Sequence, residues 1–261
     1  MNGSHQPSAM PALFVGHGSP MNAIEDNAFT RGWRDIAQRI PRPKAILCIS
    51  AHWESRGVYA SAATTPSTIH DFYGFPQALF DVRYPAPGDP ALAQRVTQLV
   101  KSIKVNTTTE YGLDHGAWSV LRVMYPQADI PVIQLSLDTT QPGAFHYRLG
   151  AELAPLRDEG VLIFASGNIV HNLRMLNFRN PAAPDWVARV DAAVRTRIVE
   201  NRHAELADWR SLDPQVALAI PSPEHYLPLL YTLGARRVDD KIHIFNSELF
   251  STISMTSVML G

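Results

Sequence analysis

Short apolar runs rich in β-branched residues alternate with amphipathic stretches along this chain, and this alternation limits its possible folds more than any other feature. It is typical of an α/β fold, in which helices flank a central sheet that is largely parallel or mixed. We expect strands at residues 12–15, 45–50, 58–62, 104–108, 132–137, 161–165 and 242–245.

The amphipathic stretches predict helices between these strands. At residues 90–103, Asp89 supplies an N-cap, Pro90 occupies the first turn, and apolar residues recur at helical spacing. Similar patterns predict helices at 145–156 and 186–199. The 261 residues contain no repeat and no Gly/Ser linker that would divide them. We therefore expect a disordered polar tail at residues 1–10 and a single catalytic domain at 11–261.

Charge and cysteine content exclude several classes of protein. The net charge is −1, and no long run of one sign offers a footprint for nucleic acid. No apolar segment approaches the roughly 18 residues that a membrane-spanning helix needs. The single cysteine, Cys48, lies in an apolar run, which excludes a disulfide framework and favours a reducing, cytoplasmic location. The sequence leaves the oligomeric state open, with a monomer among the options.

Histidines follow three of the predicted strands. His17 and His52 come directly after apolar runs, and His171 comes a few residues after a third. Because ligands bind at the carboxyl ends of parallel strands, we expect these imidazoles to share one crevice. His17 and His52 are 35 positions apart, close to the length of one strand–helix–strand unit, which predicts that their strands are neighbours in the sheet.

Neutral imidazole is a good ligand for zinc, iron, copper and nickel, and two imidazoles with one further donor leave positions for water or substrate. The pattern therefore favours His17 and His52 as ligands of a metal ion in a site without sulfur. His70, His115 and His225 lie in loops or at helix starts and are equally compatible with packing and with function.

Two competing motifs are incomplete. Gly16-His17-Gly18 opens like a dinucleotide-binding fingerprint, but Met21 stands where its third glycine belongs. Ser166 follows a strand as a hydrolase nucleophile would, but Phe164 replaces the glycine that this motif requires. Neither motif supports its function.

A further signal comes from seven segments spread in order over nearly the whole chain. They are G-H-G-S-P-M-N-A at 16–23, S-A-H-W-E at 50–54, H-D-F-Y-G-F-P at 70–76, Y-P-A-P-G at 84–88, G-L-D-H-G-A-W at 112–118, S-G-N-I-V-H-N at 166–172 and S-P-E-H-Y-L-P-L at 222–229. Together they resemble the bacterial 4,5-DOPA extradiol dioxygenase family, within the class III ring-cleaving dioxygenases of the protocatechuate 4,5-dioxygenase type.

The resemblance implies one divalent metal ion per chain, Fe(II) or Zn(II), held by His17, His52 and His225. His171 is then either a fourth ligand or the acid/base group, and His115 binds substrate or dioxygen. The wider class uses two histidines and a carboxylate, so Glu224, next to His225, is an alternative third ligand.

These residues predict an extradiol dioxygenase that inserts O2 beside the hydroxyls of a catechol such as L-DOPA, giving a seco-DOPA, a muconic semialdehyde-type product. His171 would remove a catechol proton, and His115 would stabilise developing negative charge. The expected partners are a small aromatic substrate and O2. The residues expected to contact the substrate are His70, Tyr73 and Phe75 in an aromatic loop.

Two other functions remain open from the residues. A zinc-dependent hydrolase would use the same histidine cluster to activate water. A metal-stabilised binding protein would hold a small molecule without turning it over.

Overall fold

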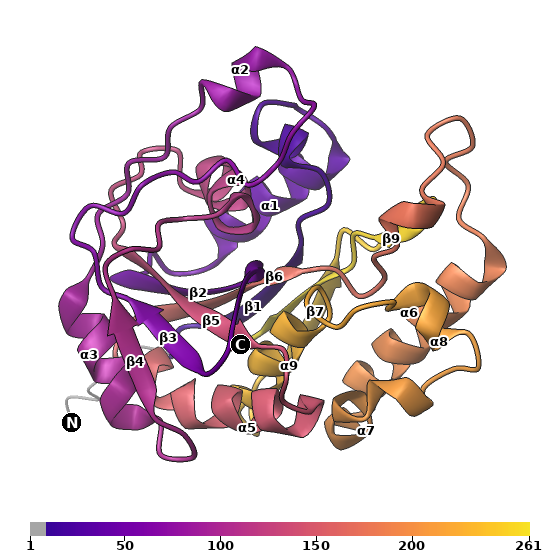
Figure 1. The fold of residues 1–261 in the computed structure, drawn as a ribbon. Coiled ribbons are helices and arrows are strands. Elements are labelled where there is room, and N and C mark those ends of the chain that lie inside the picture. Colours follow the sequence, from indigo (N-terminus) through magenta and orange to yellow (C-terminus); the bar gives the residue numbers. More distant parts are fainter. Residues whose placement is uncertain (1–8) are drawn as a thin grey trace, which may run out of the picture.

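A mixed eight-stranded sheet forms the centre of the computed structural model, which describes residues 9–261 (Figure 1). Its strands are β1 (Ala12–Gly16), β2 (Ala45–Ser55), β3 (Val58–Ser61), β4 (Val105–Thr108), β5 (Val132–Asp138), β6 (Val161–Gly167), β7 (Ile242–Phe245) and β10 (Ser257–Leu260). Their order is β4-β3-β5-β2-β6-β1-β10-β7. The inner strands β5, β2, β6 and β1 run parallel, whereas β10 pairs antiparallel with both β1 and β7. The expected α/β class is therefore confirmed.

Helices cover both faces of this sheet (Figure 1). One face carries α1 (Ala28–Arg39) and α4 (His115–Met124), and the other carries α3 (Pro90–Leu99), α5 (Gly143–Leu153), α6 (Asp185–Val199) and α9 (Leu227–Gly234). The short elements are η1 (Pro20–Ala23), α2 (Gln77–Phe80), η2 (Ala154–Arg157), η3 (Leu173–Met175), α7 (His203–Ala207), η4 (Trp209–Ser211), α8 (Val216–Ala219), β8 (Leu249–Phe250) and β9 (Ile253–Ser254). Within residues 9–261, no helix is both long and apolar enough to cross a membrane.

All the expected strands and helices are present, although several ends differ. The helix expected at residues 90–103 ends at Leu99, because Val100 adopts an extended backbone. The helix expected at 145–156 starts at Gly143 and passes into η2 after Leu153. The sequence reasoning missed α1 and β10. In α1, Phe29, Trp33 and Ile36 recur at helical spacing, and Thr30, Trp33 and Ile36 are buried, so a helical signal was present in the sequence.

The prediction that the strands of His17 and His52 are neighbours is wrong. β6 lies between β1 and β2 and pairs parallel with both. The 35 positions between His17 and His52 are enough for a crossover between neighbouring strands. This spacing cannot show whether a strand from later in the chain lies between β1 and β2. The imidazoles still meet, because β2 runs beyond its last pair with β6, Ser50 with Ser166, and carries His52 past that edge.

The two ends of the described residues meet at Arg157, which donates hydrogen bonds to the carbonyl oxygens of Met10 and Leu260. Most of the predicted tail, residues 1–8, lies outside the described residues. Met10 is only 4% exposed and accepts a hydrogen bond from Nε of Arg157 at 2.6 Å. Arg157 is itself buried and forms an ion pair with Asp240 at 2.6 Å. Met10 is therefore part of the folded core.

Two glycines at the carboxyl ends of β1 and β6 allow other segments to lie directly on the sheet edge. A Cβ at Gly16 would lie 2.7 Å from the carbonyl carbon and oxygen of Met255. A Cβ at Gly167 would lie 2.1 Å from the carbonyl oxygen of His225, which accepts a hydrogen bond from the amide of Asn168 at 2.8 Å. Because Gly167 has no side chain, the backbone of His225 can approach β6 this closely.

We predict that Gly167→Ala displaces the His225 segment and lowers the free energy of unfolding by about 1–3 kcal/mol, because the backbone oxygen it meets cannot move away as a flexible side chain would. Denaturant unfolding and metal analysis of the purified protein measure the two effects. Gly74→Ala is the control, because a Cβ there meets nothing within 4 Å and strains only a backbone with φ of 77°. A Gly167→Ala protein with native stability and full metal content would contradict this account.

Candidate metal centre

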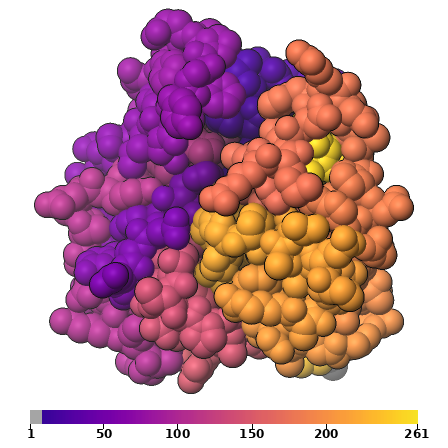
Figure 2. Space-filling model, turned by 45° about the vertical axis from the view of Figure 1, so that its right-hand side comes forward, coloured from indigo at the N-terminus to yellow at the C-terminus, as the bar shows by residue number. Residues whose placement is uncertain are grey.

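Five histidines converge at the carboxyl edge of the sheet. They are His17 after β1, His52 in β2, His115 at the start of α4, His171 after β6 and His225 before α9. The ring centroids of His52 lie 5.1 Å from His17, 3.9 Å from His115 and 5.0 Å from His225. The first three come from the early part of the chain and the last two from the later part, and Figure 2 shows a hollow where these two parts of the surface meet. The crevice expected from the sequence is therefore formed.

The hydroxyl of Ser166 fixes the tautomer of His17. Ser166 Oγ donates to the carbonyl oxygen of Gly116 at 2.6 Å, so it can only accept from Nδ1 of His17, which lies 3.0 Å away. His17 therefore carries its proton on Nδ1. Its Nε2 presents a lone pair 3.2 Å from Nε2 of His52. A protein hydrogen bond at one ring nitrogen is the usual means of aiming the other at a metal.

Glu224 fixes His225 in the same way. Its Oε1 accepts from Nδ1 of His225 at 3.0 Å and from the hydroxyl of Ser222 at 2.9 Å. Nε2 of His225 is buried, and within residues 9–261 it has no hydrogen-bond partner. Leaving a buried polar atom unpaired costs on the order of 1–3 kcal/mol. This nitrogen is therefore suited to a partner that residues 9–261 do not supply.

The carboxylate of Asp71 lies between His52 and His115. Its Oδ1 accepts from the backbone amide of His115 at 2.9 Å, and its Oδ2 lies 2.9 Å from Nδ1 of His115 and 3.5 Å from Nδ1 of His52. Burial raises the pKa of Asp71, but the hydrogen bonds from His115 outweigh it and lower that pKa to about 2. Asp71 is thus ionised near neutral pH and orients both rings.

Asp114 determines where α4 begins and thereby positions His115. Its side chain is fully buried, and Oδ1 accepts from the amide of Ala117 at 3.1 Å and from the hydroxyl of Ser50 at 2.6 Å. The first contact is an N-cap, and the second ties the helix start to β2. Burial raises the pKa of the Asp114 carboxyl. The first residue of α4, His115, is consequently held beside His52.

Burial keeps four rings of the cluster neutral. It lowers the pKa of His52 to about 3 and that of His171 to about 4, with the charge of His115 adding to both shifts. Burial followed by the charges of neighbouring rings holds the pKa values of His17 and His225 well below the usual range. Neutral rings have the lone pairs that a metal ion requires.

His171 stacks on His225 and faces open space. The two ring centroids are 3.5 Å apart, and the planes differ by 12°. Within residues 9–261, the imidazole of His171 forms no hydrogen bond. It borders a cavity of about 270 Å³ lined by His171, Asn172, Leu173, Arg174, Pro221, Ser222 and Glu224. His171 is therefore placed to contact a ligand that enters beside His225.

The donor set fits a divalent metal ion. Two nitrogens bound to one tetrahedral zinc ion are about 3.3 Å apart, given metal–nitrogen bonds of about 2.05 Å. The Nε2 atoms of His17 and His52 are 3.2 Å apart. Ligand atoms also gather within 4.8 Å in two groups, His17 with His52 and His115, and His171 with Glu224 and His225. The cluster therefore suits a metal ion, and the third ligand comes from one of these groups.

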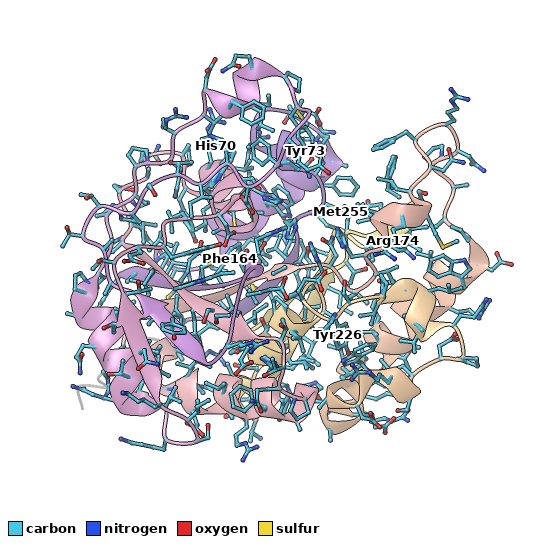
Figure 3. The ribbon with its side chains drawn as sticks, viewed as in Figure 1. His70, Tyr73, Phe164, Arg174, Tyr226 and Met255 are labelled. Atoms are coloured by element: carbon cyan, nitrogen blue, oxygen red, sulfur yellow. The ribbon has the colours of Figure 1, made fainter. Side chains whose placement is uncertain are left out.

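The residues expected to contact the substrate are spread over one loop (Figure 3). Nε2 of His70 lies 3.1 Å from the carbonyl oxygen of Val82, and its ring packs on Trp118. Tyr73, in the same loop, is 92% exposed. Phe75 lies behind Phe72, with ring centroids 5.3 Å apart. Their contact with substrate stays a prediction.

Phe72 and Asp71 are the loop residues that touch the cluster, and the sequence reasoning did not select them as site residues. The ring of Phe72 meets that of His115 edge to face at 5.6 Å. Asp71 and Phe72 both lie within the H-D-F-Y-G-F-P segment, so their position next to His70 was the available signal. The sequence pattern relates Ser166 only to a nucleophile, whereas its hydroxyl serves to orient His17.

Comparison with known proteins agrees with this geometry. Residues 3–260 match the family model for the catalytic LigB subunit of aromatic ring-opening dioxygenase. The chain belongs to this family. It is 48% identical over 259 residues to the 4,5-DOPA dioxygenase extradiol of Escherichia coli K12, covering 97% of this chain and 95% of the relative. It is 40% identical to the protein of the same name from Beta vulgaris, covering 90% of each chain.

A solved structure shows the same fold. The crystal structure of an uncharacterized protein from Escherichia coli K12 superimposes with a TM-score of 0.85 and 42% identity, covering 97% of this chain and 100% of that one. The predicted family, α/β fold and activity as an extradiol ring-cleaving dioxygenase are therefore confirmed, and the hydrolase alternative is not favoured. LigB-type dioxygenases depend on a metal ion, as the histidine cluster of this member indicates.

We predict that His225→Ala abolishes metal binding, whereas Ser166→Ala and Glu224→Gln weaken it by about 10–100-fold, because these two side chains orient ligands without touching the metal. Chelator competition and metal analysis per chain measure this. His243→Gln is the control, because His243 lies in β7 away from the cluster. If Glu224→Gln loses the metal as completely as His225→Ala, Glu224 is a ligand.

Proposed function

We propose that this enzyme cleaves the ring of L-DOPA or a closely related catechol beside its two hydroxyls. The product would be a seco-DOPA, a muconic semialdehyde-type compound. The convergence of five imidazoles at the edge of the sheet carries this proposal, since it provides metal ligands together with further groups for proton transfer. The names of the E. coli and beet relatives support L-DOPA as the substrate.

We propose His17, His52 and His225 as the metal ligands. His225 belongs to this set because its Nε2 is buried and has no hydrogen-bond partner within residues 9–261, while Glu224 holds its Nδ1. It is preferred to Glu224 because that carboxylate already accepts hydrogen bonds from His225 and Ser222. When bound, Fe(II) supplies the redox chemistry that joins a catechol to O2, which redox-inactive Zn(II) cannot supply. We therefore propose iron as the active metal.

The two remaining histidines, His171 and His115, accept a proton and stabilise negative charge, respectively. A ring nitrogen of His171 accepts a proton from a catechol hydroxyl, and its freedom from other hydrogen bonds in residues 9–261 supports this role. The Asp71 carboxylate, 2.9 Å from Nδ1 of His115, stabilises that ring when it is protonated. His115 then donates to negative charge that develops on the substrate. The edge of Phe72 excludes water beside it.

We also propose a reducing, cytoplasmic location. Its support is the single cysteine, Cys48, which is completely buried in β2. The oligomeric state stays open, a monomer being compatible with the sequence.

Oxygen uptake tests the function directly. We expect protein reconstituted anaerobically with Fe(II) to consume O2 when L-DOPA is added, with formation of a ring-opened product, and the Zn(II) form to consume none. Absence of uptake with L-DOPA and with simpler catechols would exclude the proposed reaction. Product formation without O2 consumption would indicate a hydrolase instead.

His171→Gln separates catalysis from metal binding. We expect kcat to fall by about 10²–10⁴-fold, the usual contribution of a general base, with metal content unchanged. Kinetics and metal analysis on the same preparation give both quantities. A parallel loss of metal and activity would make His171 a fourth ligand.

A further inference from the structure

The cavity beside His171 is lined by a cationic side chain, Arg174, that has no partner among the described residues. Arg174 lies in η3, directly after the His171-Asn172 pair, and lines this cavity (Figure 3). Within residues 9–261, its guanidinium forms no ion pair and no hydrogen bond. By contrast, the buried guanidinium of Arg157 is paired with Asp240. Arg174 is therefore available to an anion that comes from outside the chain.

The opposite charge lines the same cavity. Oε1 of Glu224 is occupied by His225 and Ser222, whereas Oε2 accepts no hydrogen bond within the described residues. Among the described residues, Arg174 and Glu224 are the only charged residues of the lining, apart from the titratable His171. A cavity with one cation and one anion suits a ligand that carries one of each.

Size and position agree with a side chain rather than a whole substrate. The volume is about 270 Å³, just below the range of roughly 300–1,000 Å³ that is usual for sites holding complete small molecules. The cavity shares His171 and Glu224 with the metal centre. A ring bound at the histidines would thus direct its substituent into this space.

We propose that Arg174 binds the carboxylate of the α-amino acid group on the catechol, and that Oε2 of Glu224 faces the ammonium of the same group. This inference rests on the proposed ring cleavage and specifies which catechols the enzyme prefers. The planar guanidinium can hold a carboxylate through two parallel N–H···O bonds. Arg174 is then a specificity residue that does not take part in ring opening.

Four catechols test this assignment with the Fe(II) enzyme. L-DOPA and 3-(3,4-dihydroxyphenyl)propionate carry the carboxylate, whereas dopamine and 4-methylcatechol lack it. We expect Arg174→Gln to raise KM for the first two by about 10–100-fold, the usual effect of losing a hydrogen bond to a charged group, and to leave KM for the other two unchanged. Arg174→Lys should recover part of the loss. Calorimetry without oxygen should show the same pattern in Kd.

Arg179→Gln is the matched control, because Arg179 is another exposed arginine that follows η3 but does not line the cavity. It should change none of the values. An equal rise for all four catechols, or no rise for the two carboxylates, would overturn the role of Arg174. If the wild type consumes no O2 with any catechol, ring cleavage fails, while the anaerobic Kd values still decide whether Arg174 selects carboxylates.

Discussion

Five imidazoles gathered at one edge of the sheet cannot all be protonated, and the rest of the site follows from this constraint. Burial lowers the pKa values of His17, His52, His171 and His225, so these rings are neutral. In a neutral ring, the nitrogen that donates leaves the other as an acceptor. Ser166 and Glu224 occupy Nδ1 of two rings, which leaves both Nε2 lone pairs free. Lone pairs that converge in a buried space favour a divalent cation.

The sheet provides the geometry that this convergence needs. Parallel strands bring the ends of β1, β2 and β6 to one edge, and the antiparallel β10 brings the end of the chain to the same sheet. Gly16 and Gly167 then let the backbones of Met255 and His225 approach to distances that a methyl group would prevent. The imidazole of His225 can therefore meet those of His17 and His52, although these residues are far apart in the sequence.

The side chains around the metal site form two walls, which offer different kinds of contact to a ligand. The wall from the early chain carries Asp71, Phe72 and His115, which offer an aromatic edge and a ring held by a carboxylate. The wall from the later chain carries His171, Arg174 and Glu224, which offer a proton acceptor and two opposite charges. A catechol with an amino acid substituent matches this division, since its ring and its charged end require different surroundings.

The sequence alone determined most strands of the sheet, several of the helices and the five histidines, because apolar periodicity and the residue types that bind metals are local properties. The seven segments that resemble the dioxygenase family also indicated ring cleavage. Only the tertiary structure decided that β6 separates β1 from β2, that Asp71 rather than its neighbour His70 reaches the cluster, and that Glu224 holds Nδ1 of His225. These outcomes depend on which strand enters the sheet beside which, and on the direction in which each loop turns. The pairing of β6 with β1 and β2 joins residues more than a hundred positions apart, and the contact of Asp71 with His115 joins residues 44 positions apart, so no local pattern encodes them.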